Sequence, residues 1–217
     1  MPIYTEELCH RPAPKIVSSK KHDQYVDKIE ENGHKITKEK VIHAWHVHPH
    51  GTSEVPDPPG QARPAYMWVE KGTKKAGYQH VVNEHGEDYE AQGIPPSKQA
   101  ERLPQLMEAS TTVGRHIGYA ASGRNDRPVM ATYMKEEQRM IRNGITISNN
   151  GFIVGMNPLG QDKVRRKPGD PEEVSETTMK KLYYYPPNVP DRRSTHDVQP
   201  SEPSGAQPPL KHSTNKW

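Results

Sequence analysis

The sequence predicts an α+β protein in which two helices precede a four-stranded antiparallel sheet, with extended or disordered N- and C-terminal extensions. Three observations favour this fold class. Apolar residues recur at helical spacing in residues 78–113, apolar and polar residues alternate in residues 116–156, and the flanking segments are rich in proline and charge. We therefore predict a compact domain at residues 77–159, an extension at residues 1–76 and a tail at residues 160–217.

Two helices are expected in the first half of the compact domain. Val81, Val82 and Tyr89 fall on one helical face of residues 78–92, and Gly93 is a suitable helix stop. These residues therefore predict the first helix.

The second helix is expected to begin at Pro104, because proline suits the first helical position, and to close at Gly114. Ser97 caps a separate turn at residues 98–102. The two helices would thus be joined through a short turn.

Four strands should follow, separated by the turn-forming segments GRNDR, EEQ and SNNG. Asn150-Gly151 is the strongest hairpin signal in the chain. The predicted strands are residues 116–122, 128–135, 139–147 and 152–156. The predicted core is made of apolar residues from the second helix and the strands: Leu106, Met107, Ile117, Val129, Ile145, Ile147, Phe152 and Val154.

The N-terminal extension contains a weakly patterned region and then a histidine-rich one. Short apolar groups between Val26 and Ile42 indicate a weak helix or strand pair. The histidines that follow are His43, His46, His48 and His50. The last three share one face of an extended strand, which suits a metal site, although a polar surface strand or a linker explains the same residues.

The tail at residues 160–217 contains nine prolines and almost no large aliphatic residues, which is typical of a mobile or extended segment. Its one apolar group runs from Leu182 to Tyr185. This group is expected either to add a short strand to a partner surface or to be a simple apolar patch.

Composition excludes several classes of protein. Only 31% of the 217 residues are hydrophobic, and mean hydropathy is −1.02, so the whole chain is not expected to form one core. No apolar run is long enough for a membrane-spanning helix, and we expect no membrane partner. The one cysteine, Cys9, excludes an internal disulfide. Residues 77–159 carry 8 Lys and Arg against 9 Asp and Glu, which disfavours non-specific coating of nucleic acid.

Candidate catalytic groups lie on the first helix. His80 and Glu84 are four residues apart and share a helical face, while His85 is turned away from His80. A histidine beside a carboxylate suits general acid–base chemistry near neutral pH. An ordinary surface histidine explains the same pattern equally well.

Further polar candidates lie in the predicted sheet. Arg127 precedes Pro128 and is therefore held extended, where its guanidinium can bind a phosphate with two hydrogen bonds. Thr146 and Ser148 alternate on one strand, and Asn150 follows at the turn. Polar residues also alternate outward on any one-sided sheet, so these residues alone do not establish a site.

The stretches GYQHVVNEHGEDYEAQGI, VGRHIGY and GRNDRPVMATYMKEEQRMIRNGITISNNGFIVGMNP resemble a known family. They are similar to the C-terminal toxin domains of bacterial polymorphic-toxin and contact-dependent inhibition systems, in the nuclease superfamily that groups barnase, EndoU, the tRNA-cleaving colicins and RelE. The resemblance covers residues 77–159 alone.

This resemblance implies cleavage of RNA without a metal or other cofactor. The 2′-hydroxyl is the nucleophile, so the protein supplies a base, a cation for the charge on phosphorus and an acid. Carried over by position, His80 or His85 is the base or acid, Arg127 binds the phosphate, and Thr146, Ser148 and Asn150 are hydrogen-bonding groups. The family also implies a cognate immunity protein and action in the cytoplasm of a target cell.

A hypothesis from another class competes with this one. The low apolar content and the two long extensions are also typical of a non-enzymatic interaction or structural protein, whose proline-rich ends wrap a partner.

Overall fold

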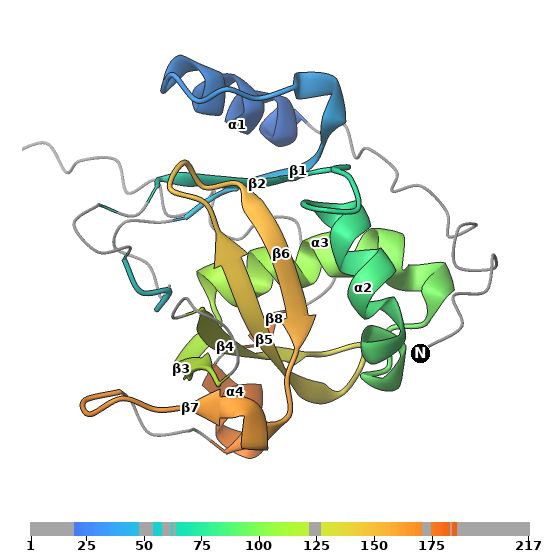
Figure 1. Cartoon of the computed structure of the whole chain (residues 1–217), viewed down its shortest axis with the longest axis vertical. Coiled ribbons are helices and arrows are strands. Elements are labelled where there is room, and N and C mark those ends of the chain that lie inside the picture. Colours follow the sequence, from blue (N-terminus) through green and yellow to red (C-terminus); the bar gives the residue numbers. More distant parts are fainter. Residues whose placement is uncertain are drawn as a thin grey trace, which may run out of the picture. The chain divides into compact units, whose positions relative to one another are not determined.

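The computed structural model describes residues 20–47, 54–57, 62, 64–121, 127–170, 175–182, 184 and 185. It is an α+β structure of helices and antiparallel sheets, which confirms the predicted class (Figure 1). Its helices are α1 (Lys20–Glu31), α2 (Tyr78–Ala91), α3 (Pro96–Thr112) and α4 (Glu176–Leu182), with short 3-10 turns at Lys38–Lys40 and Gln161–Lys163. Its strands are β1 (Val41–His46), β2 (Tyr66–Glu70), β3 (Arg115–Ala120), β4 (Pro128–Met134), β5 (Arg139–Ile147), β6 (Ile153–Pro158), β7 (Val164–Arg165) and β8 (Tyr184–Tyr185).

The main sheet is an antiparallel meander extended at one side. Its strand order is β6-β5-β4-β3-β7, and β8 pairs with β4 in parallel. The four predicted strands correspond to β3 to β6, since the polar turns between them are local signals. The prediction of a four-stranded sheet is wrong, because β7 and β8 also belong to the sheet. Each has two residues and is too short to leave a pattern in the sequence.

A second sheet consists of β1 and β2, which pair antiparallel. The hairpin turn between β5 and β6 docks on it. Trp68 N donates to Gly151 O at 3.2 Å, and Trp68 also forms a bridge with Phe152. The second sheet is therefore joined to the end of the main sheet that carries this turn.

The predicted boundary at residue 77 is wrong, because the hydrophobic core begins well before it. Apolar residues of the supposed extension belong to the same buried cluster as Val81, Leu106 and Ile145. They are Ile42, Trp45, Val47, Val55, Met67 and Val69. The proline-rich stretch between β1 and β2 hid this relationship in the sequence, since 19 residues separate the two paired strands.

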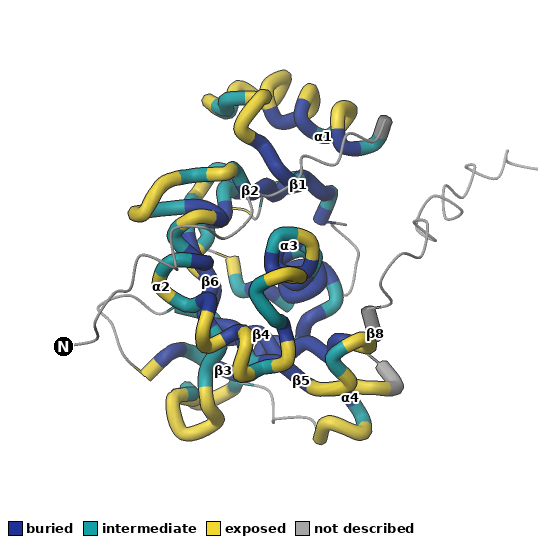
Figure 2. Tube along the Cα trace, turned by 90° about the vertical axis from the view of Figure 1, so that its right-hand side faces the viewer, coloured by how far each residue is buried: buried dark blue, intermediate teal, exposed yellow. Residues whose placement is uncertain are grey.

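Helix α1 covers the other face of the second sheet. Val26 and Ile29 are buried against Val41 and Trp68 in a cluster of their own. Figure 2 shows the buried positions of α1 facing β1 and β2, with the exposed positions on the outer side. The apolar groups between Val26 and Ile42, for which a weak helix or a strand pair was predicted, thus belong to one helix, α1, and one strand, β1.

Helix α3 differs from the prediction. It is continuous over 17 residues with Pro104 in its interior, whereas a separate turn and a helix starting at Pro104 were expected. A proline at this position removes one backbone hydrogen bond, so burial has to compensate. Leu103, Leu106 and Met107 are fully buried, and their packing keeps the helix intact.

The core confirms five of the eight predicted members. Leu106, Met107, Ile117, Val129 and Ile145 are buried. The other three, Ile147, Phe152 and Val154, are only partly buried. They lie near the β5–β6 turn, where a register shift between Thr146 and Ile147 interrupts the regular alternation of the two strands.

The predicted tail also contributes to the fold, so the boundary at residue 159 is wrong as well. Strand β7 pairs with β3, and Met179 of α4 is fully buried in a second cluster on the main sheet. Tyr184 and Tyr185 form β8 on the chain's own β4 rather than on a partner. The tail beyond residue 185 and the extension before residue 20 lie outside the described residues.

A buried polar chain fixes α2 and α3 on the sheet. The Tyr89 hydroxyl donates to Asn143 Oδ1 at 3.0 Å, and Asn143 Nδ2 donates to Ser110 Oγ at 3.2 Å. Ser110 Oγ lies 3.1 Å from Thr132 Oγ1. Burial raises the pKa of the Tyr89 phenol, which keeps its proton and remains a donor. These bonds join α2, α3, β4 and β5 in one register.

No described helix has both the length and the apolar character needed to cross a membrane.

Replacing Gly151 with alanine tests the docking of the β5–β6 turn. Gly151 has φ +97°, and an added Cβ would lie 2.3 Å from the Tyr66 backbone oxygen. Gly33 has φ +78° with open space around it and is the matched control. In urea denaturation, Gly33→Ala should cost about 1 kcal/mol of unfolding free energy and Gly151→Ala roughly 3 kcal/mol or more. Equal losses would mean that the turn is not packed on β2.

His116 should make stability depend on pH. Burial lowers the pKa of its imidazole below the ordinary value of 6.5, an effect that Asp170 partly opposes. As pH falls through 6.5, the unfolded chain therefore takes up a proton that the folded chain does not, and stability falls. In His116→Gln, the decline in unfolding free energy between pH 7.5 and pH 5 should be smaller than in the wild type. Parallel curves for the two proteins would contradict this.

Candidate functional site

The pairing of β5 with β6 determines which residues face outward. Ile145 is opposite Met156, and both side chains belong to the main core. Side chains of directly paired residues share a face, and neighbours along a strand alternate. The adjacent pairs therefore point to the opposite side of the sheet. We call this side, which carries Gly144, Thr146, Gly155 and Asn157, the outer face.

Two glycines leave hollows in the outer face, and each is occupied by a candidate side chain. A Cβ on Gly155 would lie 3.1 Å from His80 Cδ2, and a Cβ on Gly144 would lie 3.0 Å from Leu159 Cδ1 and 3.1 Å from Arg127 Nε. The two glycines are diagonal neighbours, about 7–8 Å apart in such a ladder. Thr146 is directly opposite Gly155 and exposed. The structure thus brings His80, Arg127 and Thr146 to one small area.

The start of α2 holds His80 in this position. Gly77, with φ +80°, precedes the helix, and its N–H donates to Val154 O of β6 at 2.8 Å. His80 Nδ1 lies 3.0 Å from Lys74 O. Because a carbonyl only accepts, Nδ1 carries the hydrogen, and Nε2 of the neutral ring is free to accept a proton. The expected carboxylate partner, Glu84, is exposed and is replaced in this role by the Lys74 carbonyl.

Arg127 is half-buried and lies at the start of β4. Burial lowers the pKa of its guanidinium, and the Tyr89 phenol partly opposes this effect. The group still keeps its charge, since arginine does not deprotonate in proteins. Within the described part of the chain, no carboxylate or other acceptor pairs with this guanidinium. A partly desolvated cation without a counter-charge is suited to binding an anion.

Asn157 belongs to the same face and was not among the predicted residues. It is directly opposite Gly144 and only 9% exposed. Its Nδ2 donates to Pro158 O at 3.4 Å, while its buried Oδ1 has no hydrogen-bond partner among the described residues. The predicted strand ended at residue 156, which left Asn157 outside the pattern. The sequence signal that remained was a polar residue next to the apolar run Ile153–Met156.

His85 lies close to His80 despite the different helical angle. The two ring centroids are 6.3 Å apart, with the rings nearly perpendicular. His85 Nδ1 lies 3.2 Å from Asp88 Oδ2, and because a carboxylate oxygen accepts, Nδ1 carries a hydrogen. The pair therefore offers one imidazole beside a carbonyl and a second beside a carboxylate.

The structure places Ser148 and Asn150 in the hairpin turn, away from the paired residues of the outer face. Ser148 Oγ donates to Asn150 Oδ1 and also lies 3.0 Å from Phe152 O. Phe152 N donates to Asn150 Oδ1 at 3.3 Å. Both side chains are thus engaged in closing the turn, which accounts for their residue types without any ligand.

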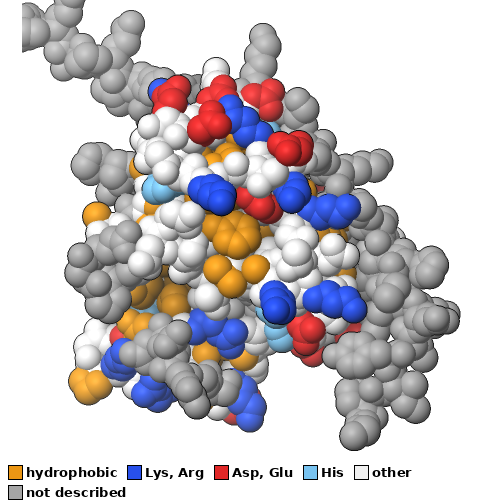
Figure 3. Space-filling view, turned by 45° about the horizontal axis from the view of Figure 1, so that its top comes forward, with side chains coloured by type: hydrophobic (Ala, Val, Ile, Leu, Met, Phe, Trp, Pro, Cys, Tyr) orange, Lys and Arg blue, Asp and Glu red, His pale blue; other side chains and the backbone are white. Residues whose placement is uncertain are grey.

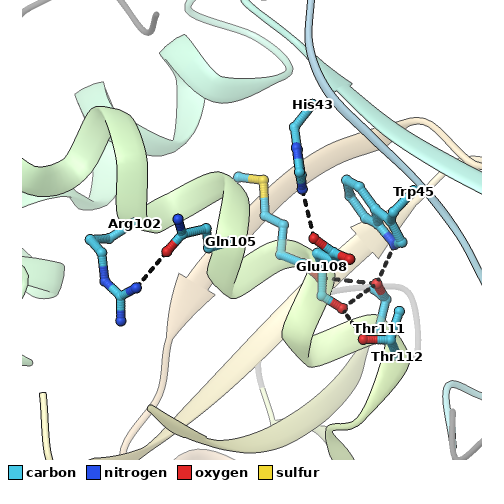
Figure 4. Close-up of polar contacts among 8 residues, drawn as sticks. His43, Trp45, Arg102, Gln105, Glu108, Thr111 and Thr112 are labelled. Atoms are coloured by element: carbon cyan, nitrogen blue, oxygen red, sulfur yellow. Dashed lines mark hydrogen bonds and ion pairs between the residues drawn. The ribbon is translucent and has the colours of Figure 1, made fainter. Parts of the chain in front are cut away.

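The histidines of β1 have other partners in the structure. His43 Nε2 lies 2.8 Å from Glu108 Oε2, and Trp45 Nε1 donates to Thr111 Oγ1 at 2.9 Å (Figure 4). The His46 ring packs edge-on against Tyr66. No group of three metal-binding side chains occurs among the described residues, and His48 and His50 lie outside them.

Charge is unevenly spread over the surface. On the face shown in Figure 3, acidic side chains gather toward the top, where α1 lies, and Lys and Arg side chains are more numerous below. The acidic residues of α1 pair partly with Lys28 and Lys38. The acidic run of α2, namely Glu84, Glu87, Asp88 and Glu90, is exposed.

No protein-family model matches the chain, and no curated protein sequence matches it significantly. The resemblance to toxin nucleases therefore stays a prediction, and a function can be inferred from the geometry of the outer face alone.

Phosphate should bind at the outer face through Arg127. A ligand that binds only the folded chain raises the unfolding free energy, by about 1.4 kcal/mol at ten times its Kd. We expect inorganic phosphate to stabilise the wild type and Arg139→Gln, which changes an exposed arginine of the same sheet, and to stabilise Arg127→Gln much less. Thermal unfolding with and without phosphate measures this. Equal responses of the two variants would exclude Arg127 as the anion site.

Proposed function

We propose that the chain is a metal-independent endoribonuclease of toxin type that acts at the outer face of β5 and β6. One observation carries the proposal: His80 and Arg127 come from different elements and lie over the neighbouring glycines Gly155 and Gly144. A base and a cation near each other are two of the three groups that RNA cleavage by its own 2′-hydroxyl requires, and His85 is the candidate for the third, the acid.

In the proposed reaction, His80 Nε2 removes the proton of the 2′-hydroxyl. The 2′-oxygen then attacks the adjacent phosphorus, and the bond from phosphorus to the 5′-oxygen breaks. Arg127 stabilises the negative charge that builds on the phosphate oxygens. Protonated His85, 6.3 Å from His80 between ring centroids, supplies the proton to the leaving 5′-oxygen. The products are a 2′,3′-cyclic phosphate and a free 5′-hydroxyl.

Thr146 places a hydroxyl on the same face of the sheet. It is exposed on β5 directly opposite Gly155, over which the His80 ring lies. In the proposal it donates a hydrogen bond to a phosphate oxygen. Ser148 and Asn150 have a different role, since both are committed to the turn that connects β5 with β6.

Incubation of the full chain with total RNA in EDTA tests the proposal. We expect cleavage with 2′,3′-cyclic phosphate ends, and losses of about 10²- to 10⁴-fold in rate for His80→Gln and for Arg127→Gln. The matched controls are His34→Gln, in the loop that follows α1, and Arg139→Gln, at the exposed start of β5. Both should retain the wild-type rate.

Two outcomes contradict the proposal. Wild-type activity in both His80→Gln and Arg127→Gln would remove the assigned groups. A folded wild type that leaves RNA intact, while limited proteolysis shows protection only with a bound partner, would favour the interaction protein instead.

A further inference from the structure

Two groups on the outer face are unsatisfied and have opposite hydrogen-bonding character. The Arg127 guanidinium has only donors, and no acceptor pairs with it in the described residues. Asn157 Oδ1 has only acceptor capacity, and no described residue donates to it. Buried polar atoms of folded proteins are almost always hydrogen-bonded, so the buried Asn157 Oδ1, on the same face as a half-buried cation, needs an explanation.

The register places these groups within reach of each other. Asn157 is directly opposite Gly144, which sets their Cβ positions about 5 Å apart on the same face. The Arg127 Nε and Cζ atoms lie 3.1 and 3.3 Å from the Cβ position of Gly144. A change of side-chain rotamer, without movement of the backbone, is therefore enough to join the amide oxygen to the guanidinium.

The orientation of the amide supports this reading. Nδ2 is turned toward the Pro158 carbonyl at 3.4 Å, which leaves Oδ1 directed away from that carbonyl. The two ends of an amide differ in hydrogen-bonding character, so only Oδ1 can serve a cation. An Asp at this position would neutralise Arg127 and compete with an anion, whereas the neutral amide does not.

We propose that Asn157 is a positioning residue for Arg127. When an anion enters, Asn157 Oδ1 accepts a hydrogen bond from one edge of the guanidinium, and the opposite edge is thereby aimed at the anion. A guanidinium has five N–H donors and a phosphate uses two of them, so both bonds form together. The inference rests on the proposed function only in taking a phosphate as the ligand.

A double-mutant cycle on inorganic phosphate affinity tests the inference. The variant is Asn157→Leu, which is similar in size and removes the buried unpaired oxygen together with the long 3.4 Å hydrogen bond from Nδ2 to Pro158 O, so it should fold. Loss of one hydrogen bond to a charged group should raise the phosphate Kd about tenfold. In the Arg127→Gln background, the same change should alter the residual Kd by less than about twofold.

The matched control is Thr146→Val, which removes a hydroxyl from the same face. Its effect on phosphate Kd should be similar in both backgrounds, because Thr146 acts on the ligand directly. An equal loss from Asn157→Leu with and without Arg127 would show that Asn157 contacts the ligand itself, and would overturn the positioning role. An unchanged phosphate Kd in the single variant Asn157→Leu would also overturn the positioning role.

The wild-type chain gives a second readout that does not depend on the variant folding. On saturation with phosphate, a guanidinium held at both edges rotates slowly, so NMR should resolve separate signals for its Nη groups. Fast rotation of Arg127 in the saturated wild type would overturn the inference. These measurements use phosphate alone. Failure of RNA cleavage with intact coupling would therefore refute the ribonuclease proposal and leave the positioning role standing.

Discussion

The register between β5 and β6 is the constraint on which both the core and the candidate site depend. With Ile145 opposite Met156, both side chains enter the core, and the glycines, Thr146 and Asn157 face outward. A slip of one residue would exchange the two faces. The hydrogen bonds of Asn143 to Tyr89 and Ser110 oppose such a slip, because they require Asn143 to point toward the helices. The buried Asn143 side chain thus determines which face of β5 carries the candidate functional residues.

Local patterns predicted the local parts of the fold. The strands β3 to β6 and helix α2 follow from turn residues and periodicity within a few positions of one another. The missed parts depend on distant contacts. Strands β1 and β2 pair across a long connection, β8 pairs with the distant β4, and α3 continues through Pro104 because both sides of the proline are buried. No propensity within a short window contains that information.

Residue chemistry predicted part of the candidate site, and backbone geometry determined the rest. His80, Arg127 and Thr146 are polar groups whose types suit the proposed reaction, but their proximity comes from a bulge near Val154 and from the anchoring of Gly77 on β6. Gly144 and Gly155 were not among the predicted residues, and the absence of a Cβ at each lets larger side chains approach the strand. Ser148 and Asn150 satisfied the same polar pattern for a different reason, the closure of a turn.

Helix α1 has few apolar neighbours of its own. Its buried residues are Val26, Ile29 and His22, with Tyr25 packed at the edge of their cluster, and Lys38 joins it through exposed ion pairs with Asp27 and Glu30. Exposed ion pairs contribute little and weaken with salt. The helix can therefore detach in a sub-global opening while the main core stays closed, and its amide hydrogens would exchange with solvent long before those of α3.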